Sequence, residues 1–306
     1  MALGLIDALK GLGRSRHKTR KGSKILVSAR AGILPTIVCE LVIDAVAARH
    51  RREISHVWTG GLDATVETLR ACSLTCRAWT PRSQYHLFHF LTVQCSQKRV
   101  EKVVALLTRN PALESRIAVL VLKPARRTLN SIPPVLSKAL PRVSEIRISQ
   151  ATVTLNSIYN IEAFLGSFAA ITTLNLFACT FQSANDLRRV VAAMSNLRTL
   201  VIDRPEWRST NPDPPHLISL PTGLRLREIF LSASAVWLED ARCSWFIHWL
   251  ALSGAVQSLT MLVLIHAMIF NDGVLEAIRG VVEASAGALE ELSWSPGTDL
   301  DYSSRE

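Results

Sequence analysis

A short apolar motif recurs seven times between residues 96 and 295. In each copy an apolar residue is followed by two others, a second apolar residue, one other and a third apolar residue. A unit of this size cannot bury its own apolar side chains, so neighbouring units must stack and share one core. The copies begin 26 to 33 residues apart and are Ile117/Leu120/Leu122, Val143/Ile146/Ile148, Ile171/Leu174/Leu176, Leu197/Leu200/Ile202, Leu226/Ile229/Leu231, Leu259/Leu262/Leu264 and Leu289/Leu292/Trp294.

Most copies follow a stretch with apolar residues at helical spacing. Each unit is therefore predicted to run from a helix through a tight turn into a short strand. The skeleton Leu87/Phe90/Thr92 is an imperfect candidate for an eighth strand. An ordinary α/β domain remains the alternative, and the even spacing favours a stacked array. The helical stretches are Val100/Val103/Val104/Leu107, Ile161/Phe164/Leu165/Phe168, Leu187/Val190/Val191/Met194 and Val274/Leu275/Ile278/Val281/Val282.

One unit carries a longer motif, Ile171-x-x-Leu174-x-Leu176-x-x-Cys179-x-Phe181. It resembles the leucine-rich repeat, in which the cysteine bonds the turning backbone. The resemblance implies a solenoid of the α/β class, with a curved parallel sheet and helices outside it. The other units carry Ala125, Ala151, Pro205, Ser234, Ala267 and Gly297 at the cysteine position, so an irregular array is expected.

A second resemblance covers about 60 residues before the repeats. It rests on Leu34-Pro35, Val38, Glu40, Val42-Ile43-Asp44, Leu69-Arg70-Ala71-Cys72-Ser73-Leu74, Cys76-Arg77-Ala78-Trp79 and Leu87-Phe88. These residues resemble an F-box. The resemblance implies a three-helix module that docks on the small adaptor subunit of a cullin-RING ubiquitin ligase. The implied docking residues are Leu34, Pro35, Val38 and Val42, with Trp79 at the edge, whereas Leu69, Leu74 and Phe88 are expected in the module's own core.

Charge and composition divide the chain further. Residues 1–30 hold eight Lys or Arg against Asp7, a net charge of +7 out of the chain's +10. We expect this basic segment to be flexible, and it fits a nuclear-import signal, a contact with RNA or lipid headgroups, or a solvated lead. Its densest stretch holds no aromatic residue for base stacking, so a nucleic-acid partner is not expected. The predicted domains are 1–30, the F-box-like module at 31–95, the repeat array at 96–295 and a polar tail at 296–306.

Signatures of catalysis and of metal binding are missing from the sequence. It contains no phosphate-binding loop, no GxSxG elbow and no HExxH motif. His86-x-x-His89 and Cys72-x-x-x-Cys76 lie in apolar stretches without further ligands, which favours core packing over a metal site. We therefore expect a non-enzyme without metal or cofactor.

Two features bear on location. The six cysteines are scattered without a CxxC pair, which favours a reducing, intracellular setting in the cytoplasm or nucleus. Residues 243–270 hold no Asp, Glu, Lys or Arg, yet polar residues and a Ser-Gly break interrupt them. We interpret this stretch as a buried helix (Trp245–Leu252), a turn and a buried strand (Leu262–Ile265), with no membrane span.

Side chains between the repeated apolar positions would line the open face of the sheet. There Phe177, Val201, Phe230 and Val263 are predicted to form an exposed apolar cluster for a protein client. The alternative is that the C-terminal segment or the loop Pro205–Pro221 covers them.

Taken with the repeat array and the missing catalytic signatures, the F-box resemblance implies a non-catalytic substrate receptor of a cullin-RING (SCF-type) ligase. The adaptor would bind the F-box-like module, and an unidentified client would bind the repeat array. The alternative is a repeat scaffold whose F-box-like module is only a structural cap. Ile37, which stands where the family has an acid, and the long linker between the halves of the module favour that alternative.

Overall fold

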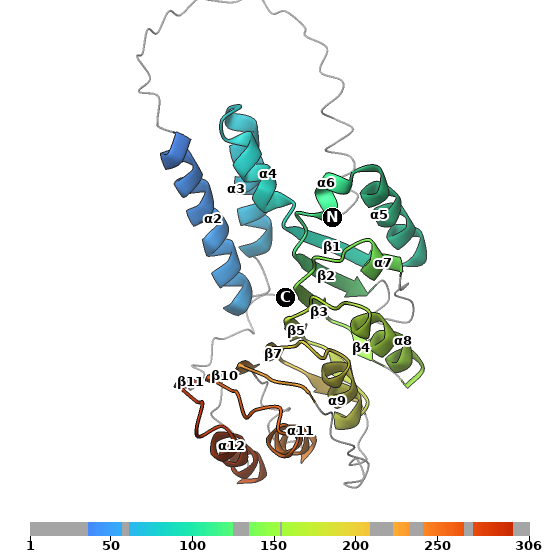
Figure 1. The fold of residues 1–306 in the computed structure, drawn as a ribbon, viewed down its shortest axis with the longest axis vertical. Helices are drawn as coiled ribbons and strands as arrows, with labels where there is room; N and C mark the ends of the chain where they lie inside the picture. Colours follow the sequence, from blue (N-terminus) through green and yellow to red (C-terminus); the bar gives the residue numbers. More distant parts are fainter. Residues whose placement is uncertain are drawn as a thin grey trace, which may run out of the picture. The chain divides into compact units, whose positions relative to one another are not determined.

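The computed structural model describes residues 36–56, 61–124, 135–153, 155–208, 223–232, 241–265 and 272–295. The chain divides into two compact units, with the boundary between Thr92 and Val93. The first unit contains helices α2, α3 and α4, and the second is an α/β unit built on a parallel sheet (Figure 1). Strand β1 (Phe90–Cys95) spans the boundary.

Three helices pack against one another in the first unit. They are α2 (Thr36–His56), α3 (Gly61–Thr75) and α4 (Thr80–Leu87). Cys39, Ile43 and Ala47 recur every four residues on α2 and are buried, as is Leu69 on α3. Because an α-helix turns once in 3.6 residues, this spacing places the buried side chains of α2 on one face.

The turn between α3 and α4 is closed by side-chain and backbone hydrogen bonds. The Thr80 hydroxyl donates to the carbonyls of Ser73 at 2.8 Å and Cys76 at 3.1 Å. The Trp79 amide donates to the Cys76 carbonyl at 3.2 Å. Pro81 occupies the first turn of α4, where a helix loses nothing from the missing N–H.

The second unit is built on an eight-stranded sheet whose strand order is β1-β2-β3-β5-β7-β9-β10-β11. The strands follow the order of the chain, and the pairs from β2 to β11 are parallel. These strands are β2 (Val119–Pro124), β3 (Glu145–Ser149), β5 (Thr173–Phe177), β7 (Thr199–Asp203), β9 (Glu228–Ser232), β10 (Met261–Ile265) and β11 (Glu291–Ser295).

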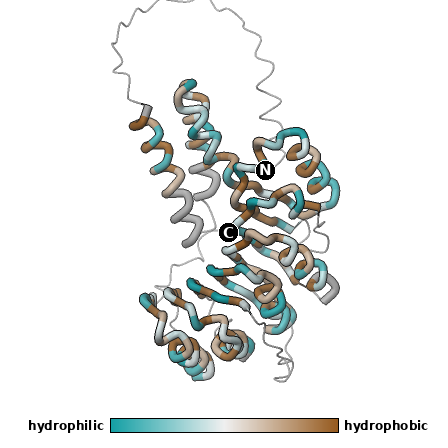
Figure 2. The backbone as a smooth tube through the Cα atoms, viewed as in Figure 1, coloured by the Kyte–Doolittle hydropathy of each residue, from teal (hydrophilic) through white to brown (hydrophobic). Residues whose placement is uncertain are grey.

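The helices of the second unit lie along one side of its sheet (Figure 1). Parallel neighbours need such crossovers, because a tight hairpin can join only antiparallel strands. The helices are α5 (Gln97–Arg109), α6 (Pro111–Glu114), α7 (Val135–Lys138), α8 (Leu155–Gly166), α9 (Ala184–Ala192), α11 (Ala241–Leu252) and α12 (Asp272–Ala284). Hydrophobic residues run through both layers (Figure 2).

The register of the sheet follows the sequence motif. The middle apolar residue of each copy pairs with the middle residue of the next, giving one row across the sheet: Leu120, Ile146, Leu174, Leu200, Ile229, Leu262 and Leu292. The first six members of that row are buried. The predicted α/β class, the parallel sheet and the helices before the strands are therefore confirmed.

The candidate eighth strand is present as β1, but its predicted inward positions are wrong. Val93 and Cys95 are its buried residues, whereas Phe90 and Thr92 are only half-buried. Successive side chains of a strand point to opposite faces, so a shift of one residue exchanges the inner and outer sets. Leu91, Val93 and Cys95 are all apolar, whereas Thr92 and Gln94 in the other set are polar, so the alternation itself favours the inner set that the structure shows.

A second, three-stranded parallel sheet, β4-β6-β8, runs beside the first in the same register. Its strands are β4 (Thr152–Val153), β6 (Thr180–Phe181) and β8 (Glu206–Trp207). Between the two sheets, Gln150, Ala178 and Arg204 take left-handed backbone conformations with φ of 54°, 46° and 48°. Each donates its amide to a carbonyl of the next strand at 2.8 Å. The chain thus repeats one turn three times.

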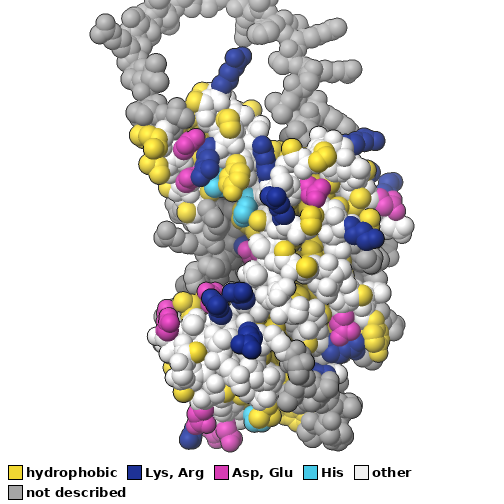
Figure 3. Space-filling view, viewed as in Figure 1, with side chains coloured by type: hydrophobic (Ala, Val, Ile, Leu, Met, Phe, Trp, Pro, Cys, Tyr) yellow, Lys and Arg dark blue, Asp and Glu magenta, His cyan; other side chains and the backbone are white. Residues whose placement is uncertain are grey.

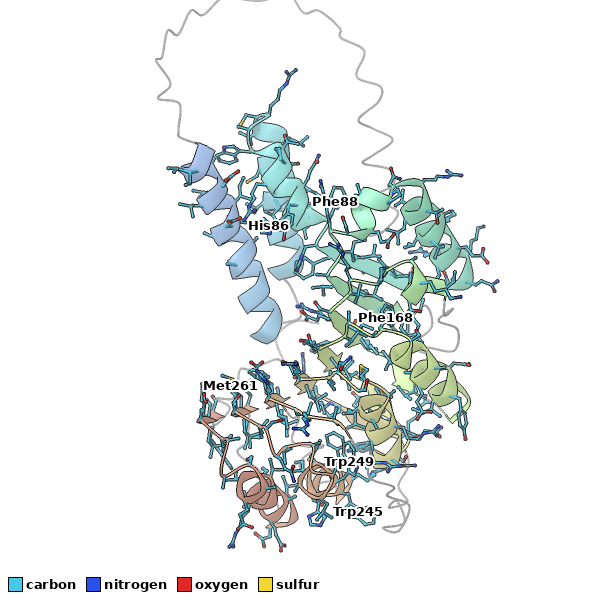
Figure 4. The ribbon with its side chains drawn as sticks, viewed as in Figure 1. His86, Phe88, Phe168, Trp245, Trp249 and Met261 are labelled. Atoms are coloured by element: carbon cyan, nitrogen blue, oxygen red, sulfur yellow. The ribbon has the colours of Figure 1, made fainter. Side chains whose placement is uncertain are left out.

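The predicted helix and strand of the uncharged stretch are present and contribute to the core, but Leu252, the last residue of the predicted buried helix, is 59% exposed. Residues 266–270 of the stretch lie outside the described residues. Cys243, Trp249 and Leu250 on α11 are buried, and Leu262 and Leu264 on β10 face the same core. Figure 4 shows Trp249 on α11 and Met261 at the start of β10. Within the described ranges, no helix combines the length and the apolar character that crossing a bilayer requires.

Candidate functional site

The first unit exposes an apolar surface at the start of α2. Ile37 is 67% exposed, Leu41 61%, Val42 47% and Val38 38%. We call these four residues the α2 apolar face. Yellow side chains gather over the start of α2 in the space-filling view (Figure 3). A contiguous group of exposed aliphatic side chains is typical of a protein-binding surface.

The α2 apolar face arises because the helix is apolar around most of its circumference. Cys39 and Ile43 already fill the face that turns towards the unit's core, so the aliphatic residues between them must face solvent. Val38 and Val42 belong to the implied docking set, and both are exposed. Ile37 and Leu41 are additions that the sequence analysis missed. The start of α2 holds more apolar residues than one buried helix face can contain, and this excess indicated that some of them would be exposed.

The other residues of the implied docking set are not shown as exposed. Trp79 is half-buried in the turn before α4, whereas Leu34 and Pro35 lie outside the described residues. Of the residues expected in the core, Leu69 is buried, but Leu74 is 74% exposed, so that expectation was wrong. Five residues along a helix correspond to about 140° of rotation, which carries Leu74 away from the buried face of Leu69. Phe88 is half-buried.

A charged cluster ties α2 to α4. Arg82 donates from Nε to Asp44 Oδ1 at 2.6 Å and from its terminal nitrogen to Oδ2 at 2.7 Å. His86 Nε2 lies 2.8 Å from Oδ1, where its N–H can donate to the carboxylate. His86 lies between the two helices (Figure 4). The Arg82 bonds, opposed by partial burial and helped by His86, lower the pKa of Asp44 from 3.8 to about 2.

The second unit presents part of its sheet face. Val201, Phe230 and Val263 are register partners on β7, β9 and β10, and all three are half-buried. We call this triplet the sheet triplet. Met261 and Ile265 flank it on β10 and are also half-buried. On one side Thr199 donates to Glu228 Oε2 at 3.0 Å across two strands. The alternate residues of these strands, such as Leu200 and Ile229, are buried on the helix side.

Phe177 does not belong to an exposed cluster. It is only 5% exposed, and the guanidinium of Arg204 lies 4.5 Å from its ring centroid. Arg204 also approaches Asp203 Oδ1 at 3.6 Å. An arginine that stacks on an aromatic face removes that face from water. The predicted four-residue surface is therefore corrected to the three members of the sheet triplet.

The sheet face changes character between β5 and β7. On β3 and β5, Arg147, Ser149 and Asn175 are buried, whereas their counterparts on β7 to β10 are half-buried. Arg147 Nε donates to Glu145 Oε1 at 2.5 Å, which compensates the buried guanidinium. The accessible part of the face thus lies over β7, β9, β10 and β11.

Residues with catalytic or metal-binding potential take other roles. His86 is engaged with Asp44, and Cys179 Sγ donates to the carbonyls of Ile148 and Phe177 at 3.5 Å each. Cys72 is half-buried and Cys76 is exposed. Over the described segments, no three His, Cys, Asp or Glu side chains gather as a metal site would require.

Comparison with known proteins adds no relative. No protein-family model matches the chain, and no curated protein is significantly similar to it. The α2 apolar face and the sheet triplet are therefore the features on which a function is argued.

Proposed function

We propose that this chain is a non-catalytic recruitment subunit of a cullin-RING ubiquitin ligase. Its first unit would dock on the ligase adaptor through the α2 apolar face, and its second unit would hold a protein client through the sheet triplet. Transfer of ubiquitin would then depend on proximity, because a tethered client meets the loaded enzyme at a high effective concentration.

The observation that carries the proposal is the exposure of the α2 apolar face. Val38 and Val42 belong to the set that the F-box resemblance assigns to adaptor contact. Exposing four aliphatic side chains to water is unfavourable in free energy. Covering them in a partner's groove removes this cost and so favours binding.

The second unit supports the client half of the proposal. Parallel strands in one register give a broad, rigid platform, which lowers the entropy cost of binding. On that platform the sheet triplet offers partly exposed apolar side chains bordered by Glu228 and Asp203. This mixture of an apolar centre and a polar border is typical of a protein-binding surface. The resemblance to leucine-rich repeats also favours a protein client bound on the sheet face.

Adaptor binding is tested with the purified chain and the purified adaptor of a cullin-RING ligase. We expect the wild type to bind and the double variant Val38→Asp/Val42→Asp to lose binding by at least about tenfold, since two charges enter an apolar interface. Leu252→Asp is the matched control, because Leu252 is 59% exposed on α11 in the second unit. Circular dichroism checks that all three proteins remain folded.

Failure of the folded wild type to bind the adaptor would refute the ligase assignment. It would favour the alternative in which the helical module is a structural cap of a scaffold. Equal losses in the α2 variant and in the Leu252 control would show that the effect is not specific to the α2 apolar face.

The client half is tested separately at Phe230. Because Phe230 is half-buried and its neighbours on the helix side form the core, we expect Phe230→Asp to fold. A crosslinking screen with adaptor-bound chain should lose the bound client in this variant. Aggregation of the variant would instead show that Phe230 is part of the core.

A further inference from the structure

The described part of the second unit finishes with strand β11, whose inner side chains are exposed. β11 is the last strand in the sheet order over the described residues. Its Leu292 pairs with Leu262 and its Trp294 with Leu264. The two β10 residues are 2% and 1% exposed, whereas Leu292 is 52% exposed and Trp294 45%. The positions that are buried in the preceding repeats are thus exposed in β11.

An edge strand with apolar side chains is a template for further strand pairing. Repeat arrays ordinarily close such an end with a polar cap, because the last unit has no neighbour to cover its core side. Leu275 on α12, the helix that precedes β11 in the chain, is also 42% exposed. The features therefore favour an added strand over free exposure to water.

The sequence of β11 is complementary to itself. In an antiparallel pair of two copies centred on Ser293, Leu292 lies opposite Trp294 of the second copy, and Glu291 lies opposite Ser295. Residues directly opposite in an antiparallel pair share a face, so the apolar pair stays on the helix side. Each glutamate meets a serine, so no like charges lie directly opposite. A two-fold contact requires such self-complementarity.

We propose that two copies of this chain associate through β11, in an antiparallel pair centred on Ser293 that joins their sheets edge to edge. The contact covers Leu292 and Trp294 with those of the second copy. One five-residue strand and a few side chains from each copy make a small interface, so we expect reversible, concentration-dependent dimerisation. This proposal does not depend on the ligase assignment.

The first experiment measures mass by sedimentation velocity over a concentration series of the full chain. We expect a monomer–dimer equilibrium in the wild type and a dissociation constant at least about tenfold higher in Leu292→Lys, which places two charges in the contact. Leu252→Lys is the matched control with a similar exposed leucine, and we expect it to dimerise like the wild type.

The second experiment tests the register by disulfide formation in a Cys72→Ser/Cys76→Ser background, because the other four cysteines are buried. A cysteine at Ser293 faces its own copy with the Cα atoms about 5 Å apart, within reach of a disulfide. A cysteine at Ser295 lies four residues along the strand and one strand across from its counterpart, about 14 Å away. We therefore expect rapid crosslinking of Ser293→Cys and slow crosslinking of Ser295→Cys.

Three outcomes would overturn the proposal. The first is a wild type that stays monomeric up to its solubility limit, which would show that β11 does not pair with a second copy. The second is a dimer that persists unchanged in Leu292→Lys. The third is equal crosslinking at Ser293 and Ser295, which would indicate random collisions.

Discussion

Arg82 holds both carboxylate oxygens of Asp44, with nitrogen–oxygen distances of 2.6 and 2.7 Å, and this pair of residues 38 positions apart in sequence joins α4 to α2. Such a two-pronged pair fixes orientation as well as distance. It sets how α4 lies against α2, the helix that carries the α2 apolar face.

Removing the carboxylate should loosen the first unit. We expect Asp44→Ala to lower its free energy of unfolding by about 1–3 kcal/mol, because the imidazole of His86, 8% exposed, loses its acceptor. Arg82→Met should cost about 1 kcal/mol or less, since Arg82 is 38% exposed and water screens the pair. Hydrogen exchange of peptides from α2 and α4 reports both changes.

A surface pair supplies the control for these variants. Arg279 and Glu283 form an ion pair on α12 with 79% and 63% exposed side chains. Arg279→Met should leave exchange in α2 and α4 unchanged. If Asp44→Ala exchanges no faster than the wild type, the cluster does not hold the helices.

The same pair should make the first unit sensitive to acid. The folded-state pKa of Asp44 is lowered to about 2 from an ordinary value of 3.8. Its contribution is therefore complete above about pH 4 and is lost as the pH falls towards 2. Thermal unfolding of wild type and Asp44→Asn between neutral pH and pH 2 should show a difference that shrinks below pH 4. A difference that is constant with pH would assign the effect to shape and not to charge.

A glycine should stabilise the repeated turn. Ala178 has φ of 46°, a conformation that costs a residue with a Cβ about 1–2 kcal/mol. We expect Ala178→Gly to raise the free energy of unfolding by about 0.5–1 kcal/mol, after the entropy cost of glycine. Ala192→Gly at the end of α9 should act in the opposite direction. Urea titration of both variants checks the sign, and destabilisation by Ala178→Gly would contradict it.

The cysteines should differ widely in reactivity. Burial raises the pKa of the Cys95 and Cys179 thiols to about 12, which leaves almost no thiolate at neutral pH. Cys76 is exposed. Iodoacetamide at pH 8 should therefore label Cys76 in the folded chain and the two buried thiols only after unfolding, as peptide mass spectrometry would detect. Equal labelling of Cys179 and Cys76 would refute the buried position of Cys179.

The sheet could be predicted from the sequence because its motif repeats. Leu174, Leu200 and Ile229 stand at one position of successive units, and stacking units must align that position to share a core. The helices followed from apolar residues at 3.6-residue spacing. One copy of such a motif is ambiguous, and seven in series are not.

The errors came from contacts that no periodicity encodes. Phe177 is buried under Arg204 of the next repeat, a contact that depends on a left-handed turn at Arg204. The sequence predicted exposure of Val38 and Val42 but not of the other two residues of the α2 apolar face. When apolar residues lie on every side of a helix, their pattern does not show which side is buried. Exposure is a property of the folded neighbours and not of the residue type.

The alignment of equivalent residues across the sheet has a consequence for how the protein fails. In the part of the large sheet that the structure describes, each strand pairs with its immediate neighbours in the sheet order. Damage in one repeat should therefore affect the adjacent repeats most and fade beyond them. Such a chain should unfold progressively from one end and not in a single cooperative step. Unfolding should begin at the β11 end, where inner side chains already meet water, while β3 and β5 keep their structure longest.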